Sequence, residues 1–175
     1  FVALIFIGAF LLMLPKATNH SITFLNALFT STSAVCVTGL SVYDVPYTFS
    51  TFGQFIIMIL VQIGGLGILT FAAYIAYFFK GNSSFEYQIT LGNISNNDAF
   101  SEVFSFIKRI IFLTFSIELI GAIFIYISLN NLNTSITDKI FLSIFHSISA
   151  FCNAGFSILP NGFSHNIILN NYFLK

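Results

Sequence analysis

The sequence predicts an all-α integral membrane protein in which a unit of span, short helix, loop and span occurs twice in parallel. Only 7% of its 175 residues are charged and 57% are hydrophobic, whereas about 25% of residues are charged in ordinary soluble domains. The apolar residues gather in long runs, and the stretch from Val45 to Phe79 carries no charge. Runs of more than about 18 apolar residues are typical of membrane spans. Two shorter segments of similar sequence lie 116 positions apart, which indicates the repeat.

The first apolar run extends from Phe1 to about Leu14 and ends at Pro15 and Lys16, a helix stop followed by an interfacial charge. A helix of this length is shorter than the bilayer core of about 30 Å. No initiator Met or charged segment precedes Phe1, so the run lacks the pattern of a signal peptide. We therefore expect a fragment that begins inside a helix.

Two further runs are long enough to cross the bilayer. The second predicted span covers Gly53 to Phe79, and the third covers Ile110 to Leu129. The stretch 80–109 between them carries basic residues at both ends. Because positive residues mark cytoplasmic loops, this stretch is predicted to be a cytoplasmic linker.

The last part of the linker has helical periodicity. Between positions 97 and 108, Phe100, Val103, Phe104 and Ile107 recur at the spacing of one helix face. Such a face is typical of a helix that lies on the membrane surface. We expect a short amphipathic helix there, before the third span begins.

The chain is thus predicted to contain two repeats joined by the linker. The bounds are 1–79 for the first repeat (short helix and loop 21–45, span 53–79), 80–109 for the linker, and 110–175 for the incomplete second repeat (span 110–129, short helix and loop 137–157). Each short helical segment is apolar for only about a dozen residues, which is typical of re-entrant segments rather than spans.

The internal repeat is ungapped over thirteen positions. Residues 29–41 read FTSTSAVCVTGLS and residues 145–157 read FHSISAFCNAGFS, and seven positions are identical. Two predicted spans, an even number, lie between the copies, so both copies enter the membrane from the same face. The repeats are therefore parallel, unlike the inverted repeats of many transporters.

A short helix that stops inside the membrane suits a cation. The negative end of its dipole points toward the membrane interior, and irregular backbone at that depth survives only when it is buried in protein or lines a water-filled path. Backbone carbonyls can then replace the water of a dehydrating cation. The candidate filter residues are Cys36, Val37, Thr38 and Gly39 in the first copy and Cys152, Asn153, Ala154 and Gly155 in the second.

The two glycines are the residues on which this interpretation depends most. Gly39 and Gly155 can adopt backbone conformations that are closed to other residues, which carbonyls directed at one axis require. The alternative is that both are ordinary turn glycines. Their occurrence at matched positions after matched short helices favours the filter.

These motifs resemble those of the Trk/Ktr/HKT superfamily of cation transporters, and most closely the bacterial Ktr/Trk membrane pore subunit. Residues 26–40 (NALFTSTSAVCVTGL) resemble the first pore helix and filter, residues 62–67 (QIGGLG) resemble the glycine motif of the next helix, and residues 145–156 resemble the second filter. The resemblance implies a pore of four linked units, each giving one filter loop. Only units one and two are present here, and the second lacks its final span.

The resemblance also implies the substrate and the partners. Gly39 at the first filter position implies potassium, as the transported ion and as the metal held by the filter backbone, because serine there accompanies sodium transport in similar proteins. Similar proteins are homodimers in the bacterial plasma membrane, take up potassium, in some cases by symport, and meet a cytosolic ring of nucleotide-binding regulatory subunits. The linker 80–109 would face that ring. A sodium or ammonium channel or transporter with the same parallel repeats is the alternative.

Other interpretations are weaker. Glu118 lies near the middle of the third span, where an ionisable group is expensive; it is either a coupling site or a carboxyl that is hydrogen-bonded to a neighbouring helix. A formal net charge of zero argues against nucleic-acid binding. Since no nucleophile, base and orienting group form a recognisable pattern, we expect neither an enzyme nor an organic cofactor. His146, Cys36 and Cys152 lack the spacing of a transition-metal site.

Overall fold

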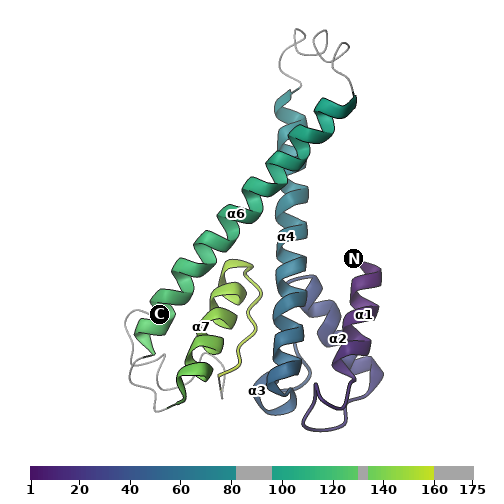
Figure 1. Ribbon diagram of the computed structural model, residues 1–175. Helices are drawn as coiled ribbons and strands as arrows, with labels where there is room; N and C mark the ends of the chain where they lie inside the picture. Colours follow the sequence, from purple (N-terminus) through teal and green to yellow (C-terminus); the bar gives the residue numbers. More distant parts are fainter. Residues whose placement is uncertain (82–95, 130–133, 160–175) are drawn as a thin grey trace. The chain divides into compact units, whose positions relative to one another are not determined.

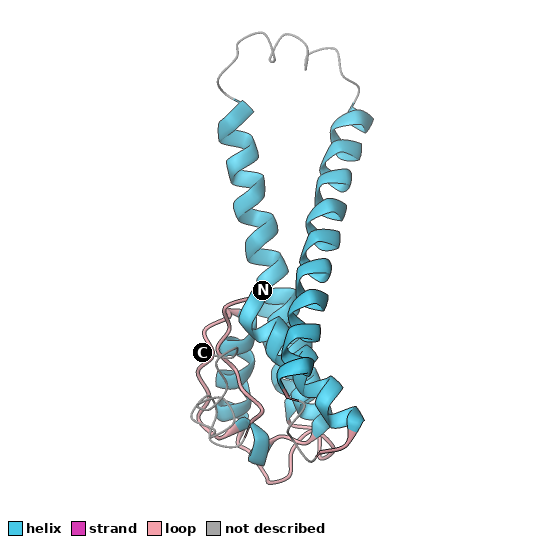
Figure 2. Ribbon diagram, turned by 90° about the vertical axis from the view of Figure 1, so that its left-hand side faces the viewer, coloured by secondary structure: helices cyan, strands magenta, loops and turns pink. Residues whose placement is uncertain are grey.

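Regular structure in the described chain is helical. The computed structural model describes residues 1–81, 96–129 and 134–159. Its helices are α1 (Val2–Leu12), α2 (Phe24–Val35), α3 (Val45–Thr48), α4 (Thr51–Gly81), α6 (Asn96–Ser128) and α7 (Ile136–Phe151), drawn in Figures 1 and 2. Among these residues no strand forms beyond one isolated antiparallel bridge between Thr18 and Phe49. The chain divides into two compact units, one of residues 1–65 with those from 117 onward, and one of residues 66–116.

Two helices are long and apolar enough to cross a membrane, over Thr51–Phe71 in α4 and Ile107–Ser128 in α6. The second predicted span lies wholly within α4, and α6 ends one residue before the third predicted span does. An all-α membrane class agrees with this result. The predicted bounds of the repeats and linker remain predictions.

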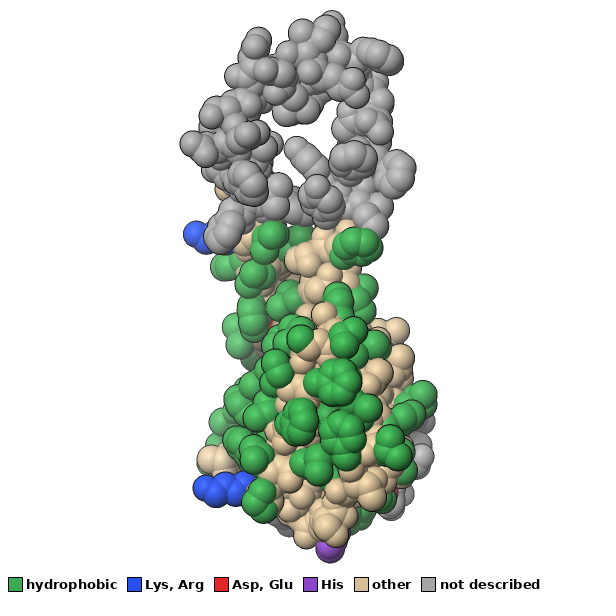
Figure 3. Space-filling view, turned by 90° about the vertical axis from the view of Figure 1, so that its right-hand side faces the viewer, with side chains coloured by type: hydrophobic (Ala, Val, Ile, Leu, Met, Phe, Trp, Pro, Cys, Tyr) green, Lys and Arg blue, Asp and Glu red, His purple; other side chains and the backbone are tan. Residues whose placement is uncertain are grey.

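The surface of the spans is apolar rather than polar. Phe112, Leu119 and Phe124 of α6 are 75%, 64% and 67% exposed. Figure 3 shows apolar side chains spread over the surface on the side where α1 lies, and α1 exposes Phe6 and Phe10. Isolated exposed apolar residues are ordinary, but contiguous apolar patches of this kind mark contact with lipid or with other protein.

One expectation about the linker is wrong. The segment 97–108 is not a separate surface helix, because it forms the beginning of the continuous helix α6. No Gly or Pro occurs between Asn96 and Ile120, so nothing in the sequence stops the helix before the span begins. The remainder of the linker, 82–95, lies outside the described residues.

The first unit has one apolar core to which both sequence repeats contribute. Its largest fully buried side chains include Phe49 and Ile57 from the first repeat and Phe145 and Phe156 from the second. The short helices α2 and α7 have 12 and 16 residues, or about 18 and 24 Å. Neither helix reaches across a bilayer core of about 30 Å. The core therefore combines two short helices and the loop after each of them with parts of α1 and α4.

Side-chain caps fix where the short helices begin. The hydroxyl of Thr23 accepts a hydrogen bond from the Asn26 backbone at 3.4 Å, and Ser135 accepts one from Asp138 at 3.1 Å. Such caps satisfy backbone donors that have no partner inside the helix. Asp138, in the first turn of α7, also complements the positive end of the helix dipole.

Candidate functional site

The helix α2 ends in a turn whose hydrogen bonds follow the Schellman pattern. Cys36 is the C-cap. The Val37 amide donates to the Ala34 carbonyl at 3.2 Å, and the Thr38 amide donates to the Ser33 carbonyl at 2.9 Å. These two bonds satisfy carbonyls that the helix itself leaves without partners.

The helix α7 ends in the same way. Cys152 is the C-cap. The Asn153 amide donates to the Ala150 carbonyl at 3.0 Å, and the Ala154 amide donates to the Ser149 carbonyl at 2.7 Å. Every donor and acceptor is the residue 116 positions after its counterpart in the first turn. The sequence repeat therefore corresponds to a repeated backbone structure.

The backbone dihedrals repeat as well. Val37 and Asn153 both have φ of 57°, and Gly39 and Gly155 have φ of 71° and 75°. Positive φ is ordinary for glycine and tolerated by asparagine, but for a β-branched residue such as Val37 it is an outlier. Residues held in such conformations cost about 1–3 kcal/mol each and gather at functional sites. The strain at Val37 therefore makes the first turn a candidate for a functional role.

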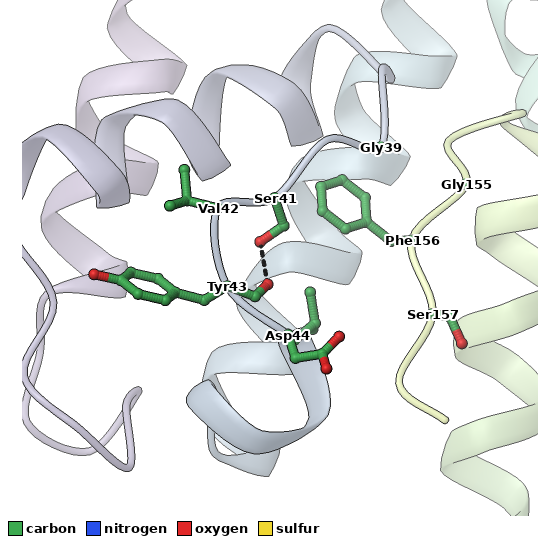
Figure 4. Close-up of a pocket in the computed structure, with 9 residues that line it drawn as sticks. Gly39, Ser41, Val42, Tyr43, Asp44, Gly155, Phe156 and Ser157 are labelled. Atoms are coloured by element: carbon green, nitrogen blue, oxygen red, sulfur yellow. Dashed lines mark hydrogen bonds between the residues drawn. The ribbon is translucent and has the colours of Figure 1, made fainter. Parts of the chain in front are cut away.

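The two loops meet at Gly39. A Cβ atom on Gly39 would lie 1.8 Å from the carbonyl oxygen of Ala154, whereas a Cβ on Gly155 would meet nothing within 4 Å. In Figure 4 the loops face each other, and Phe156 extends from the second toward the first. Gly39 is therefore required both for its φ and for the close approach of the second loop, while Gly155 is required for its φ alone.

Serine side chains of the short helices form hydrogen bonds with the loop that follows each helix. The Thr38 hydroxyl lies 2.9 Å from the hydroxyl of Ser33, and the Ser149 hydroxyl donates to the Phe156 carbonyl at 2.7 Å. Ser33 and Ser149 are the matched serines of the repeat. One serine position thus anchors both loops, although it binds a different atom in each.

His146 also supports the second loop. Its Nδ1 lies 2.9 Å from the Leu142 carbonyl, and its Nε2 lies 3.0 Å from the Ser157 hydroxyl. Thr30, at the matched position of α2, makes only the first kind of contact, a 2.9 Å bond to the Asn26 carbonyl. The histidine therefore adds a brace to the second loop that the first loop does not have.

Each short helix is also attached to the helix that precedes it. The Ser31 hydroxyl donates to the Ile5 carbonyl at 2.7 Å, and the Ser147 hydroxyl donates to the Glu118 carbonyl at 2.6 Å. A glycine makes room for each serine: a Cβ on Gly8 would lie 2.3 Å from the Ser31 oxygen, and a Cβ on Gly121 would lie 2.6 Å from the Ser147 oxygen. The repeat therefore extends into the preceding helices.

The sequence carries a signal for this extension that the ungapped alignment missed. Residues 7–9 and 120–122 both read IGA, with an offset of 113 rather than 116 positions. The change of offset means that three more residues separate the IGA segment from the short helix and its loop in the second repeat than in the first. An alignment that allowed one gap would have found Gly8 and Gly121.

The glycine motif of α4 packs against both turns. A Cβ on Gly64 would lie 2.2 Å from the Val35 carbonyl oxygen, and a Cβ on Gly65 would lie 2.4 Å from the Cys152 sulfur. Adjacent glycines thus let one helix approach the end of α2 and the end of α7. Close helix packing is the usual role of small residues inside membrane proteins.

A pocket of about 450 Å³ opens beside the two glycines. Its lining residues come from the loop before α3 and from the second loop, and eight of them are labelled in Figure 4: Gly39, Ser41, Val42, Tyr43, Asp44, Gly155, Phe156 and Ser157. Asp44 is the only charged side chain of this lining. The pocket therefore places the negatively charged side chain of Asp44 beside the candidate filter loops.

Three candidates remain: Glu118 and the two cysteines. Glu118 is buried and its carboxyl contacts the amide of Gln62, a partner that the sequence did not predict. Cys36 and Cys152 are both free thiols. Among the described residues, no three His, Cys, Asp or Glu side chains are grouped to hold a metal ion.

The helices and the exposed apolar surface of the described residues are consistent with an all-α membrane protein, and comparison with known proteins gives its family. A family model described as cation transport protein, TrkH, matches residues 1–171. The chain belongs to the TrkH family of cation transport proteins, which are transporters rather than enzymes.

Three relatives show the similarity in detail. The chain is 41% identical over 157 residues to Ktr system potassium uptake protein B of Bacillus subtilis, covering 90% of this chain and 35% of that protein. It is 37% identical over 161 residues to potassium/sodium uptake protein NtpJ of Enterococcus hirae, covering 91% and 36%. It is 34% identical over 164 residues to Ktr system potassium uptake protein B of Vibrio alginolyticus, covering 92% and 35%. The chain therefore spans about a third of the length of these relatives.

Proposed function

We propose that this chain forms the first two of four filter units of a potassium-uptake pore, in which backbone carbonyls of residues 36–39 and 152–155 bind the ion. One observation carries the proposal: two loops at matched positions adopt the same strained turn, with positive φ at Val37 and Gly39 and again at Asn153 and Gly155. The same backbone conformation at both loops, which in the first is kept despite the cost at Val37, argues for a shared task.

The conformation suits the task for a geometric reason. In an extended chain, successive carbonyls point to opposite sides. Residues with positive φ interrupt this alternation, so neighbouring carbonyls can turn toward one side. Positive φ occurs at positions 37 and 39 but not at Thr38 between them. Carbonyls of such a segment can replace the hydration shell of a cation without a fixed charge that would hold it too tightly.

Potassium is the favoured substrate on two grounds. The Bacillus relative is named a potassium uptake protein, and the first filter position is Gly39 rather than the serine that accompanies sodium transport in similar proteins. The Enterococcus relative is named a potassium/sodium uptake protein, so sodium is the second candidate. Ammonium is the third, since its size is close to that of potassium.

We also propose the setting in which the pore works. The full-length protein is a multi-pass protein of the bacterial plasma membrane and a homodimer, and its cytoplasmic face, including 80–109, meets a ring of nucleotide-binding regulatory subunits. The support is family resemblance. Co-purification of the full-length protein with such a regulator tests the contact, and purification as a lone monomer would contradict it.

The experiment that tests the filter compares wild type, Gly39→Ser and Gly155→Ser in the full-length protein. The host cells lack other potassium uptake, and membrane abundance is measured for each variant. Wild type is expected to restore growth at low potassium, and each serine variant is expected to admit more sodium relative to potassium. Folded variants with unchanged selectivity would contradict the filter assignment.

A further inference from the structure

Glu118 and Gln62 form a buried polar pair between two membrane helices. The Gln62 Nε2 atom lies 2.9 and 3.1 Å from the two carboxyl oxygens of Glu118. Gln62 is 9% exposed and Glu118 is 5% exposed. The residues lie on α4 and α6, so the pair joins the last helix of the first repeat to the first helix of the second.

If Glu118 is ionised, the hydrogen bonding between Glu118 and Gln62 is incomplete. Gln62 Oε1 is buried and has no hydrogen-bond partner among the described residues. No Lys or Arg side chain of the described segments pairs with Glu118. An ionised Glu118 would therefore be a buried charge without a counter-ion beside an unpaired buried acceptor, and both are costly.

A proton on Glu118 removes the buried charge, and it also satisfies Gln62 Oε1 once the amide turns so that one carboxyl oxygen faces Nε2 and the other faces Oε1. A neutral carboxylic acid has one O–H donor and one carbonyl acceptor, which matches the one free acceptor and the N–H donors of the Gln62 amide. Rotating the amide does not remove this requirement. If Oε1 faced Glu118 instead of Nε2, only a protonated carboxyl could donate to it.

We propose that Glu118 is held as a neutral acid that shares its proton with Gln62 Oε1, and that this acid–amide pair positions the second filter loop. Two contacts lead from the pair to that loop. The Glu118 carbonyl accepts a hydrogen bond from Ser147 of α7 at 2.6 Å, and Gly65, one turn along α4 from Gln62, lies against Cys152. Glu118 and Gln62 are therefore positioning residues and do not touch the ion.

The neighbouring titratable side chains, Cys152 and His146, have contacts with residues outside the Glu118–Gln62 pair. On α7, Cys152 faces Gly65 of α4, and the two ring nitrogens of His146 lie near Leu142 and Ser157 rather than Glu118. The acid–amide pairing is the same whether the pore carries potassium or sodium, whereas its effect on the second filter loop rests on the proposed function.

The test is infrared spectroscopy of the purified full-length protein at neutral pH. The wild-type minus Glu118→Gln difference spectrum is expected to show loss of a protonated carboxylic acid band. Gln62→Met, which keeps the chain length but removes the amide, is expected to shift that band to higher frequency. Asp138→Asn, which removes an exposed carboxyl at the start of α7, is the control and is expected to leave the band in place. Loss of ionised carboxylate bands in Glu118→Gln, with no acid band in wild type, would overturn the proposal.

Cation uptake gives a second readout. The amide of Glu118→Gln has the shape and hydrogen-bonding groups of the neutral acid, so uptake is expected to stay within about threefold of wild type, whereas Glu118→Leu, which leaves the Gln62 amide unpaired, is expected to lose at least about tenfold. Equal loss in both variants would overturn the positioning role. If Glu118→Gln does not reach the membrane, a folded Gln62→Met with an unshifted acid band overturns the pairing. The spectra do not depend on transport, so they separate failure of this proposal from failure of the proposed function.

Discussion

Replacing the two candidate filter glycines by alanine separates their roles. Gly39 and Gly155 have nearly the same φ, 71° and 75°, so the added methyl group meets the same backbone strain at both. A left-handed conformation costs an L-residue about 1–2 kcal/mol. Only at Gly39 does the new atom also meet a neighbour, the Ala154 carbonyl oxygen at 1.8 Å.

The contact at Gly39 cannot be relieved by rotating a side chain, because the neighbour is backbone. The second loop must move, and overpacking of this kind costs about 1–3 kcal/mol in addition. We therefore expect Gly155→Ala to destabilise the filter by about 1–2 kcal/mol and Gly39→Ala by about 2–5 kcal/mol. Since about 1.4 kcal/mol is a factor of ten, the difference of about 1–3 kcal/mol corresponds to a factor of about 5 to 150 between the two variants in potassium-dependent stabilisation.

The assay is thermal unfolding of the full-length protein in detergent over a series of potassium concentrations, with choline as the control cation. Wild type should be stabilised at the lowest potassium concentration, Gly155→Ala at a higher one, and Gly39→Ala at the highest or not at all. Equal shifts for the two variants would show that the loops do not meet at Gly39 and would refute the reasoning.

Three further predictions concern single side chains. Val37→Asn removes a β-branched residue from a left-handed position and should raise stability by about 1 kcal/mol, measured as a higher unfolding temperature; no change would contradict strain at this residue. Ser147→Ala should cost about 0.5–1.5 kcal/mol by the loss of its bond to the Glu118 carbonyl, and an unchanged melting curve would contradict that bond. His146→Thr keeps a donor for the helix carbonyl but loses the contact to Ser157, so we expect weaker selectivity with normal membrane abundance, and unchanged selectivity would count against the brace.

The sequence predicted the local parts of the fold well. Apolar runs with polar ends predicted the long helices, because a helix that crosses the bilayer needs about 20 consecutive apolar residues. The thirteen-position repeat predicted two loops of like structure, and the dihedrals at positions 37, 39, 153 and 155 agree with it. Whether their carbonyls bind an ion remains a prediction.

Other features depend on contacts that have no local pattern. Gln62 and Glu118 are 56 positions apart, and neither residue type indicates its partner. A valine does not predict positive φ, since its own preference opposes it; the tertiary structure imposes the turn at Val37. The separate surface helix over 97–108 was wrong because periodicity marks a helix face but not where the helix ends.

Competition among cations for uptake tests the central claim most directly. The full-length protein is reconstituted in liposomes, and uptake of labelled potassium is measured against increasing sodium and ammonium, for wild type and for Gly39→Ser. Wild type should favour potassium over both ions, and the serine variant should lose part of that preference over sodium. Equal competition by sodium in wild type, or a Gly39→Ser variant with unchanged preference, would contradict a potassium filter built on these two loops.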